Sequence, residues 1–354
     1  MAGTVNLGVI GAGYWGSKLI KKFSSLGNVK ISTVADLDKN RLFPIKNSFP
    51  KIKTVIDYKQ VTNDNNINAI VIATPVSTHF RVAKEALLSG KNVFIEKPLS
   101  QTLKSAKELT NIARKNKLTI TTDFTYLYHP AIQKIKEMIT RGKLGKILFI
   151  QSVRMGLELF PKGVDVVWDL APHDISIILY LFDKMPKKIN IFKNGIINKD
   201  TPDTSFINLN FSGKLSAQII NSWLSPVKVR HFVIGGTRGT LVFDETKTSQ
   251  LLFFNTEIEK YNKPRIHSNK IKSFIKNIEI SNPENLPSNK QDFAVRGKHR
   301  IFQPSQKGKK ISFQNQEALL EICQNFINSI KNRELTDQKT DLSLKTVEIL
   351  EKLQ

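Results

Sequence analysis

The chain has 354 residues, of which 40% are hydrophobic and 24% charged, an ordinary globular composition whose length favours two domains. No run approaches the ~20 apolar residues of a membrane-spanning helix, no basic and apolar leader opens the chain, and the single cysteine, Cys323, excludes an internal disulfide, so we expect a cytoplasmic protein with neither a membrane nor a metal partner. The net charge is +24, but residues 1–123 (19 Lys and Arg against 8 Asp and Glu) and residues 255–310 (13 against 5) share the excess, and this spread argues against a nucleic-acid partner.

The first 123 residues alternate short apolar runs with helical patterns. The sequence predicts strands at residues 5–10, 30–36, 69–73, 92–95 and 119–122, with helices at residues 14–26, 78–89 and 102–116. Thr78 and Thr102 are predicted N-caps, and Gly90 is placed to end the second helix. Strands that alternate with helices of this length predict an α/β fold with a doubly wound parallel sheet, and we assign residues 1–123 to this first domain.

The pattern changes after residue 123. Helices are predicted at residues 131–141, behind Pro130, and at 173–181, and strands at 147–154, 204–211, 215–222, 229–235, 239–243 and 251–254. Two further helices, 316–330 and 342–353, close the chain. Closely spaced strands without crossover helices predict a largely antiparallel sheet in a second domain, residues 124–354. Within it, residues 255–310 are rich in Lys, Asn, Ser and Pro, and we expect an irregular basic excursion.

A glycine motif, Gly11-x-Gly13-x-x-Gly16, directly follows the first predicted strand and opens a helix. The first glycine permits a tight turn, the second lets the backbone approach a pyrophosphate, and the third lets the helix pack on the strand. The helix N-terminus then offers free N–H groups to the phosphates. Asp36 follows Gly16 by 20 residues, the spacing of an acid that binds the adenosine ribose. Together these features predict a Rossmann dinucleotide-binding domain.

The residues around Asp36 also bear on the choice of cofactor. A carboxylate at this position accepts hydrogen bonds from a ribose diol and repels a 2′-phosphate. Asp38 adds negative charge, whereas Lys39 and Arg41 offset it. We therefore predict NAD as the cofactor, with NADP the less favoured alternative.

Two more motifs follow strands whose carboxyl ends meet at the same ligand-binding edge. Thr74-Pro75 comes after the third predicted strand, where the alternative is a simple turn, and Glu96-Lys97-Pro98 comes after the fourth. A lysine at this edge can lie beside a nicotinamide and donate a hydrogen bond to a substrate hydroxyl, although most Lys-Pro pairs are surface turns.

The pair Asp169-x-x-x-His173 stands at the start of a predicted helix. Spacing of four places both side chains on one helical face if the helix already includes Asp169, and Pro172 makes that inclusion partial. Histidine is the side chain best suited to exchange a proton near neutral pH. The alternative is an aspartate that caps the helix and a histidine that packs in the core.

Taken together, these motifs resemble the Gfo/Idh/MocA family of oxidoreductases. The resemblance extends to His79, His129-Pro130, residues 236–239 and the closing helices, and covers nearly the whole chain. It implies a Rossmann domain followed by an α/β domain with an open mixed sheet, whose face forms a homodimer or homotetramer. One departure lies at residues 163–168, where many relatives have a glycine-rich run before the Asp-x-x-x-His element.

The resemblance also implies roles for individual residues. Lys97 contacts substrate and nicotinamide, His173 is the acid/base that removes the hydroxyl proton, and Asp169 orients His173 or binds substrate. The implied cofactor-binding residues are Gly11, Gly13, Tyr14, Trp15, Gly16, Asp36, Thr74, Pro75, His79, Glu96 and Lys97. The implied substrate-binding residues are Lys97, Tyr126, Arg154, Trp168, Asp169, His173 and Arg230, and no metal is needed.

The substrate implied by the resemblance is a sugar or polyol, oxidised at a ring hydroxyl or reduced at the corresponding ketone. Residues 168–182 and 222–230 are most similar to members that act on nucleotide sugars, where Lys228 and Arg230 can face a diphosphate or be solvated strand charges. A free-sugar or inositol dehydrogenase is the nearest alternative. A non-catalytic NAD-binding regulator is a further one, but it has no need of Lys97, Asp169 and His173.

Overall fold

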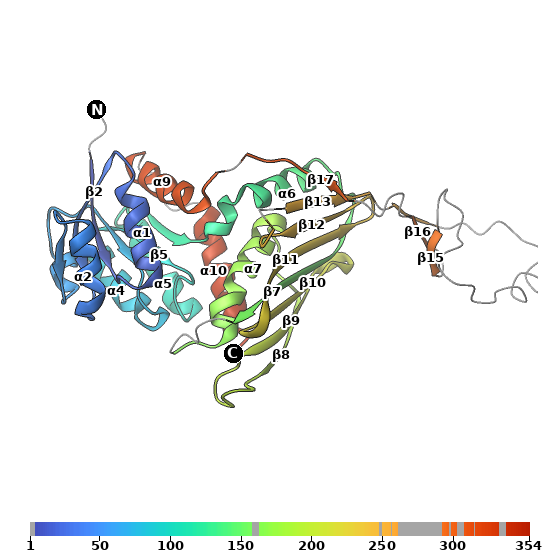
Figure 1. Ribbon diagram of the computed structural model, residues 1–354, viewed down its shortest axis with the longest axis horizontal. Coiled ribbons are helices and arrows are strands. Elements are labelled where there is room, and N and C mark those ends of the chain that lie inside the picture. The colour runs from blue at the N-terminus through green and yellow to red at the C-terminus, as the bar shows by residue number, and fades with distance from the viewer. Residues whose placement is uncertain are drawn as a thin grey trace, which may run out of the picture.

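The computed structural model describes residues 4–157, 163–247, 250–255, 257–260, 292–296, 299–302, 308–314, 316–332 and 338–354. Two β-sheets, each with helices packed against it, follow one another along the long axis of the molecule (Figure 1). The first sheet has six strands and the second has eight. The predicted fold class, a parallel Rossmann sheet followed by a largely antiparallel mixed sheet, is confirmed.

The first sheet is the Rossmann sheet. Its strands are β1 (Val5–Ile10), β2 (Val29–Ala35), β3 (Lys53–Val55), β4 (Ala69–Ile72), β5 (Asn92–Glu96) and β6 (Ile120–Asp123), and its helices are α1 (Tyr14–Ser24), α2 (Lys39–Ser48), α3 (Lys59–Thr62), α4 (Val76–Leu88) and α5 (Leu103–Lys115). The strands pair in parallel in the order β3-β2-β1-β4-β5-β6. The order reverses between β1 and β4, and ligands of doubly wound sheets bind outside the strand ends at such a switch point.

The sequence predicted most of these elements and missed three of them. Helix α2 contains Pro44 and buries few apolar side chains, α3 is one turn long, and β3 has three residues, so none gives a clear periodic signal. Thr102 caps α5 as predicted, because its hydroxyl accepts a hydrogen bond from the Ser105 N–H at 3.1 Å. The predicted cap at Thr78 is wrong, since α4 begins at Val76, directly after Pro75.

The second sheet is built from β7 (Ile147–Leu157), β8 (Lys188–Asn194), β9 (Thr204–Asn210), β10 (Ser216–Ser222), β11 (Leu224–Gly236), β12 (Thr240–Asp244), β13 (Gln250–Phe254) and β17 (Lys309–Lys310). Their order is β17-β13-β12-β11-β7-β10-β9-β8. The β7–β10 pair is parallel and the other described pairs are antiparallel. The turn η1 (Thr125–Tyr128) and helix α6 (Pro130–Thr140) connect the first sheet to this one, and helix α7 (Val166–Phe182) lies between β7 and β8.

Helix α7 begins seven residues earlier than the sequence predicted. Its N-cap is Asp165, whose carboxylate accepts a hydrogen bond from the Trp168 N–H at 2.9 Å, and Pro172 lies inside the helix. Most of the helix is buried, and it packs against β9 and β10. Asp169 and His173 therefore lie one turn apart on a single helix, and this placement resolves the doubt that Pro172 raised.

The described part of residues 255–310 includes three short strands. Strands β14 (Glu257–Lys260), β15 (Asp292–Arg296) and β16 (His299–Phe302) pair in an antiparallel sheet in the order β14-β16-β15. The prediction of an irregular excursion is wrong for these strands, which are too short to give a periodic signal in a Lys- and Asn-rich sequence. The remainder of that predicted excursion, apart from residues 255 and 308–310, lies outside the described residues.

The two closing helices pack back against the Rossmann half (Figure 1). Helix α9 (Ala318–Lys331) places the Phe326 ring between Phe23 of α1 and Phe94 of β5, with ring centroids 6.3 Å and 5.5 Å away. Helix α10 (Gln338–Glu351) packs on both α5 and α7. The division of the chain into two domains near residue 123 stays a proposal. Helix α9 comes after this boundary but packs against the Rossmann core.

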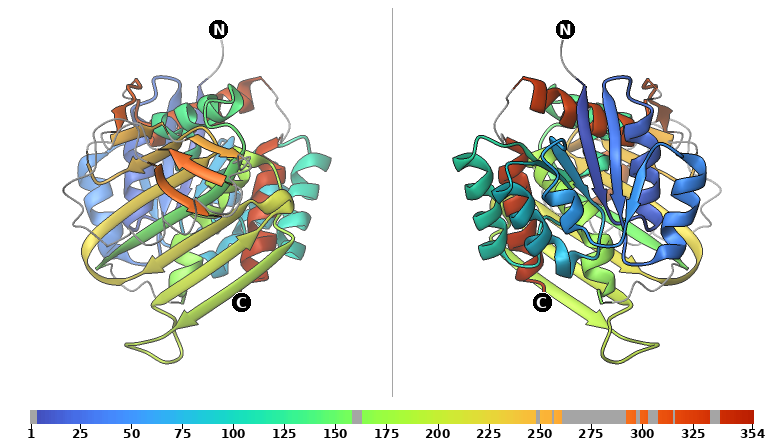
Figure 2. Two further views of the ribbon diagram at one scale, coloured as in Figure 1. Left: turned by 90° about the vertical axis from the view of Figure 1, so that its right-hand side faces the viewer. Right: turned by 90° about the vertical axis from the view of Figure 1, so that its left-hand side faces the viewer.

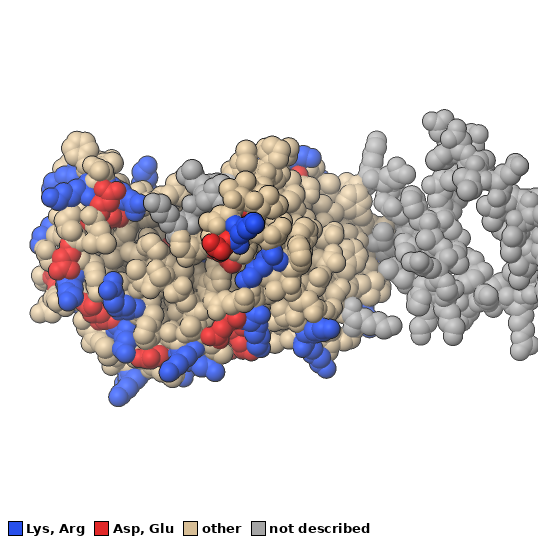
Figure 3. Space-filling view, turned by 90° about the horizontal axis from the view of Figure 1, so that it is seen from below, with Lys and Arg blue, Asp and Glu red and all other residues tan. Residues whose placement is uncertain are grey.

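The surface gives two further observations. On the face seen in Figure 3, lysine and arginine side chains lie among aspartates and glutamates and do not gather in one patch. Among the residues that the structure describes, no helix is both long and apolar enough to span a bilayer.

The phenylalanine cluster predicts how the chain responds to truncation of Phe326. Phe326→Ala should lower the free energy of unfolding by about 3–5 kcal/mol, because it leaves a cavity between α9 and the Rossmann core. Denaturant unfolding followed by circular dichroism measures the change. Leu88→Ala, which truncates a side chain that is 63% exposed, is the control and should change stability little. Equal losses in the two variants would contradict this packing.

Candidate active site

The glycine turn has the geometry of a phosphate cradle. Gly11 adopts a φ of +98°, and a Cβ there would lie 2.5 Å from the Ala73 carbonyl oxygen. A Cβ on Gly16 would lie 2.0 Å from the Gly11 carbonyl oxygen, so helix α1 packs against the turn only without a side chain. A Cβ on Gly13, the N-cap of α1, would meet only a nitrogen of the Arg41 side chain, at the ordinary contact distance of 3.5 Å, which leaves the helix N-terminus open to a ligand.

Asp36 lies directly after β2, beside this turn. Its carboxylate accepts hydrogen bonds from the Ala12 N–H at 2.7 Å and the Asp38 N–H at 2.9 Å. Arg41 lies 3.9 Å from the same carboxylate and 3.5 Å from that of Asp38. A pocket of about 370 Å³ opens here, and its lining includes Gly11, Asp36, Arg41, Thr74, Pro75 and Arg81. The pocket sits at the switch point of the sheet and fits an adenosine.

His79 lies in the interior, between two loops at the ligand-binding edge of the first sheet. Its side chain is buried, and its two ring nitrogens lie 2.8 Å from the Thr74 carbonyl oxygen and 2.9 Å from that of Pro98. Burial lowers the pKa of His79, and both ring nitrogens face carbonyl acceptors. His79 thus lies between the loop after β4 and the loop after β5, and its predicted contact with the cofactor stays a proposal.

Lys97 connects the two halves of the site. It follows β5, precedes Pro98 through a cis peptide bond, and has a side chain that is 10% exposed. Its ammonium group donates to the Asp169 carbonyl oxygen at 2.5 Å and lies 3.6 Å from the Asp169 carboxylate. The other carboxylate oxygen of Asp169 accepts from the indole N–H of the buried Trp223 at 3.1 Å. Asp169 thus orients Lys97, and among the described contacts none joins it to His173.

His173 faces the same cavity as Lys97. The ring of Tyr126 packs edge-on against it, with centroids 5.0 Å apart. Burial, reinforced by the positive charges of Lys97, Arg154 and Arg230, holds the pKa of His173 well below its usual value. The imidazole is therefore neutral at physiological pH and can accept a proton.

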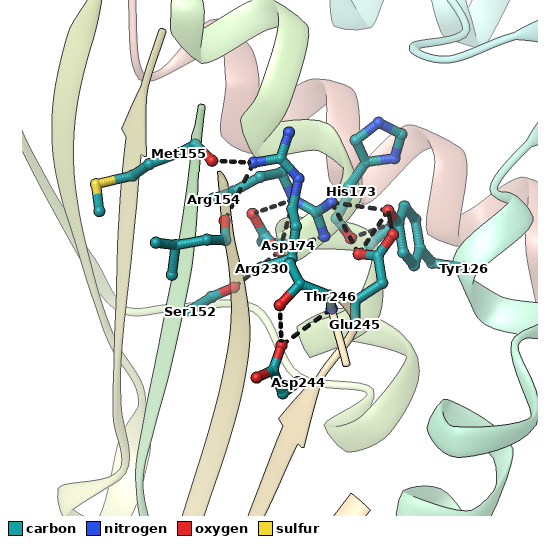
Figure 4. A network of polar contacts seen from close by, with 12 residues as sticks. Tyr126, Ser152, Arg154, Met155, His173, Asp174, Arg230, Asp244, Glu245 and Thr246 are labelled. Atoms are coloured by element: carbon teal, nitrogen blue, oxygen red, sulfur yellow. Dashed lines mark hydrogen bonds and ion pairs between the residues drawn. The ribbon is translucent and has the colours of Figure 1, made fainter. Parts of the chain in front are cut away.

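A buried polar network supports His173 from the second sheet (Figure 4). Arg154 of β7 pairs with Asp174 of α7 at 3.1 Å and donates to the Tyr126 hydroxyl at 2.9 Å. That hydroxyl donates to the Glu245 carboxylate at 2.8 Å. Burial raises the pKa of Tyr126 to about 12, so the phenol stays protonated. Tyr126 therefore has a defined orientation against the His173 ring.

Two buried carboxyl groups form the floor of the cavity. Glu96 and Asp123 are paired in register at the ends of β5 and β6, and both line the cavity. Burial and the neighbouring Asp123 raise the pKa of Glu96 well above its usual value. Asp123 accepts from the Thr125 hydroxyl at 2.5 Å, whereas Oε1 of Glu96 has no protein partner. An unpaired buried oxygen at this place is suited to accept a hydrogen bond from a bound ligand.

The central cavity has a volume of about 450 Å³. Of the predicted site residues, it brings together Trp15, Glu96, Lys97, Tyr126 and His173. Trp168 instead packs in the core of the second domain, since it lies on the buried face of α7. Arg230 is also buried, and its guanidinium donates to the Met155 carbonyl oxygen at 2.7 Å, so its contribution to the site is its charge.

The sequence motifs did not indicate several residues of this site. Glu245, Asp123 and Thr125 line the cavity, and Asp174 holds Arg154. The sequence could have indicated Asp123, because this residue ends the strand that neighbours the strand ending at Glu96. Glu245 lies in a turn after β12 with no motif around it, so only the folded structure brings it to Tyr126.

The arrangement fits a nicotinamide dinucleotide. The open helix N-terminus, the carboxylate of Asp36 and the free Oε1 of Glu96 lie along one edge of the sheet and match phosphates, a ribose and a polar ring substituent, respectively. Among the residues that the structure describes, no group of three His, Cys, Asp or Glu side chains can hold a metal ion.

The match to known families agrees with this geometry. Residues 5–124 match the family described as the oxidoreductase family with an NAD-binding Rossmann fold, and residues 132–242 match the GFO/IDH/MocA C-terminal domain. A myo-inositol 2-dehydrogenase from Thermotoga maritima is 21% identical over 303 residues, which is 79% of this chain and 90% of that relative.

Two solved structures share the fold over nearly the whole chain. One is a UDP-N-acetylglucosamine 3-dehydrogenase from Acidithiobacillus ferrooxidans, with a TM-score of 0.74, 18% identity, and coverage of 98% of this chain and 95% of that one. The other is a 3-ketoreductase from Actinomadura kijaniata in complex with TDP-benzene and NADP, with a TM-score of 0.76, 15% identity, and coverage of 98% and 96%. The chain is an NAD-binding oxidoreductase that belongs to the Gfo/Idh/MocA family.

Proposed function

We propose that this protein transfers hydride between NAD and a sugar ring carbon that bears a hydroxyl, with Lys97 and His173 as its catalytic residues. The observation that carries the proposal is that both side chains face one cavity beside the glycine cradle. Asp169 fixes the Lys97 ammonium from the second domain. Of the possible substrates, we favour a nucleotide sugar.

The chain supplies positioning and proton transfer. Neutral His173 accepts the proton of the reacting hydroxyl, since its pKa is depressed and its ring is held by Tyr126. Lys97 donates a hydrogen bond to the same oxygen and stabilises negative charge as it develops there. The nicotinamide, when bound, takes up or returns the hydride. In the reverse direction, protonated His173 returns the proton to the carbonyl oxygen.

The substrate class is supported by what relatives and structural neighbours act on. The names of two neighbours refer to nucleotide sugars or a nucleotide analogue, and that of a relative refers to myo-inositol.

Turnover with NAD should be measured across UDP- and dTDP-sugars, free sugars and inositols, by the NADH absorbance. Oxidation of a nucleotide sugar supports the proposal, and oxidation of inositol alone supports the alternative. Tight NADH binding without any turnover would instead indicate a non-catalytic regulator.

The partner that the open sheet face fits is a second copy of the chain. Helix α7 packs against one face of the second sheet, and in the part of the chain that the structure describes no helix covers the other face (Figure 2). Phe192, Phe206 and Ile220 are register partners that form an apolar row across three strands of the open face, with Phe192 64% exposed. We propose a homodimer or homotetramer through this face in a cytoplasmic enzyme.

The catalytic assignment predicts the effect of two single substitutions. Lys97→Ala and His173→Ala should each reduce turnover by a factor of about 10²–10⁴, because each removes a group that acts on the reacting oxygen. Binding of NADH, measured by calorimetry, should stay nearly unchanged. Wild-type turnover in either variant would remove that residue from the mechanism.

The depressed pKa of His173 predicts the pH dependence of oxidation. The neutral base is present above its pKa, so kcat/KM should stay constant from pH 7 down through pH 6.5 and fall only at lower pH. Arg230→Gln removes a positive neighbour, which raises the pKa of His173 and moves the acid limb to higher pH. Lys228→Gln, on the same strand and exposed, is the matched control. An unchanged limb in Arg230→Gln would contradict the assignment.

The position of Asp36 predicts cofactor preference. Asp36→Ala should shift the ratio of kcat/KM toward NADP, because it removes the ribose acceptor and leaves Arg41 and Arg81 at the pocket for a 2′-phosphate. Steady-state kinetics with both cofactors measures the ratio, and Asp57→Ala is a surface control. A ratio equal to that of the wild type would remove Asp36 from cofactor selection.

A further inference from the structure

The active-site cavity extends beyond the catalytic residues. From Lys97 and His173 its lining continues past Trp15 and along α1 to the N-terminus of α9. The residues that line this extension are Lys18, Lys21, Lys22, Glu317, Ala318 and Leu319. The cavity volume of about 450 Å³ is in the range of pockets that hold ligands larger than a single ring.

The three lysines of this wall differ in their partners. Lys22 pairs with Glu317 at 2.6 Å, so its charge is compensated. The Lys18 ammonium donates to the Tyr14 hydroxyl at 2.8 Å and lies over the Tyr14 and Trp15 rings, at 4.1 Å and 4.5 Å from their centroids. Among the described residues, no carboxylate pairs with Lys18 or Lys21. The wall therefore presents two positive charges that the protein does not neutralise.

Helix stability explains only part of this arrangement. Lys18 and Lys21 are three residues apart on α1, and like charges at this spacing repel each other by a few tenths of a kcal/mol. The dipole at the C-terminal end of α1 favours Lys21 and Lys22, which lie in the last turn, but not Lys18. The helix dipole therefore accounts for Lys21 and Lys22, whereas Lys18 gains nothing from it although it also lines the cavity.

The acidic groups of the cavity do not offset these charges. Glu96 and Asp123 lie in the floor beside Lys97, and burial raises the pKa of both. Glu245, in the opposite wall, is bonded to Tyr126 and lies 3.6 Å from Arg154. The remaining acid of the lining, Glu317, is the partner of Lys22.

The cofactor phosphates are also accounted for elsewhere. They are expected at the N-terminus of α1, where Gly13 leaves the backbone open. Lys21 lies eight residues further along the helix, which is about 12 Å at the rise of an α-helix. Lys21 is therefore separate from the dinucleotide cradle, whereas the Lys18 ammonium reaches back over the Tyr14 and Trp15 rings of the first turn of α1.

We propose that the sugar substrate carries an anionic group, a phosphate or a carboxylate, and that Lys18 and Lys21 bind this group beside Trp15 while the reacting hydroxyl lies at Lys97 and His173. The proposal rests on the proposed function for the position of the hydroxyl, but not for the anion site itself. The diphosphate of a nucleotide sugar and the carboxylate of a sugar acid share the required chemistry. Both are drawn to the cavity by its positive charge.

The test combines binding and turnover. UDP and D-glucuronate are titrated by calorimetry into the protein saturated with NADH, which keeps the probes out of the dinucleotide cradle. The variant is Lys18→Glu/Lys21→Glu. The matched control is Lys104→Glu/Lys107→Glu, which makes the same charge change at the same spacing on the exposed side of α5. UDP binding indicates a phosphate site, and glucuronate binding indicates a carboxylate site.

The proposal predicts that Lys18→Glu/Lys21→Glu raises the Kd of the bound probe about 10–100-fold, since two attractive charges become repulsive. The control variant should stay at wild-type values, and, with NADH or NAD kept saturating in every measurement, the KM of an anionic substrate should rise while kcat changes little. Lysine-dependent binding of either probe without any turnover supports the anion site and contradicts the proposed function. Oxidation of neutral sugars or inositol only, with no change in the variant, overturns the anion site and leaves the proposed function intact. Equal probe affinity in the wild type and the variant, or no probe binding at all, likewise overturns it.

Discussion

The contact between Lys97 and Asp169 is the interaction on which the rest of the site depends. The backbone of Lys97 belongs to the Rossmann sheet, whereas its ammonium is held by the first turn of α7 in the second domain. A paired charge of this kind adds little net stability, because desolvation offsets the attraction. The contact instead fixes the position of the Lys97 ammonium, between the place where the nicotinamide is expected and His173.

The second constraint is electrostatic. Burial lowers the pKa of His173, and the positive charges of Lys97, Arg154 and Arg230 lower it further, so the imidazole is neutral. The same charges favour an oxygen that becomes negative as its proton leaves, so one field prepares the base and stabilises the developing product. Arg154 can be buried here because Asp174 neutralises it and Tyr126 accepts its second hydrogen bond. The network in Figure 4 is therefore part of the chemistry as well as of the core.

The fold class followed from periodicity in the sequence, and the cofactor cradle followed from three glycines and one aspartate. Those signals are local, since each motif lies within a strand, a turn and a helix. The contacts of Asp169 could not be derived in this way. The spacing to His173 suggested that the two residues form a pair, but in the folded chain the carboxylate turns to Lys97, which is 72 residues away, and to Trp223.

Glu245 and the lysines of α1 show the same limit in another form. Lys18 and Lys21 are ordinary residues of an amphipathic helix until α9 returns from the end of the chain and closes a cavity over them. Glu245 reaches Tyr126 across 119 residues. Such sites form only when distant segments of the chain pack together, so no short sequence motif indicates them. His79 also acquires contacts that its motif did not indicate, with the carbonyl oxygens of Thr74 and Pro98.

The central claim is that hydride leaves a ring carbon of the substrate while His173 takes the proton of its hydroxyl. The most direct measurement uses a substrate carrying deuterium on the carbon that bears the reacting hydroxyl, with the reduced cofactor analysed by mass spectrometry. The account predicts that the reduced cofactor carries the deuterium and that a ketone forms in equal amount. Deuterium that stays on the substrate or washes into the solvent, with no reduced cofactor formed, would contradict it.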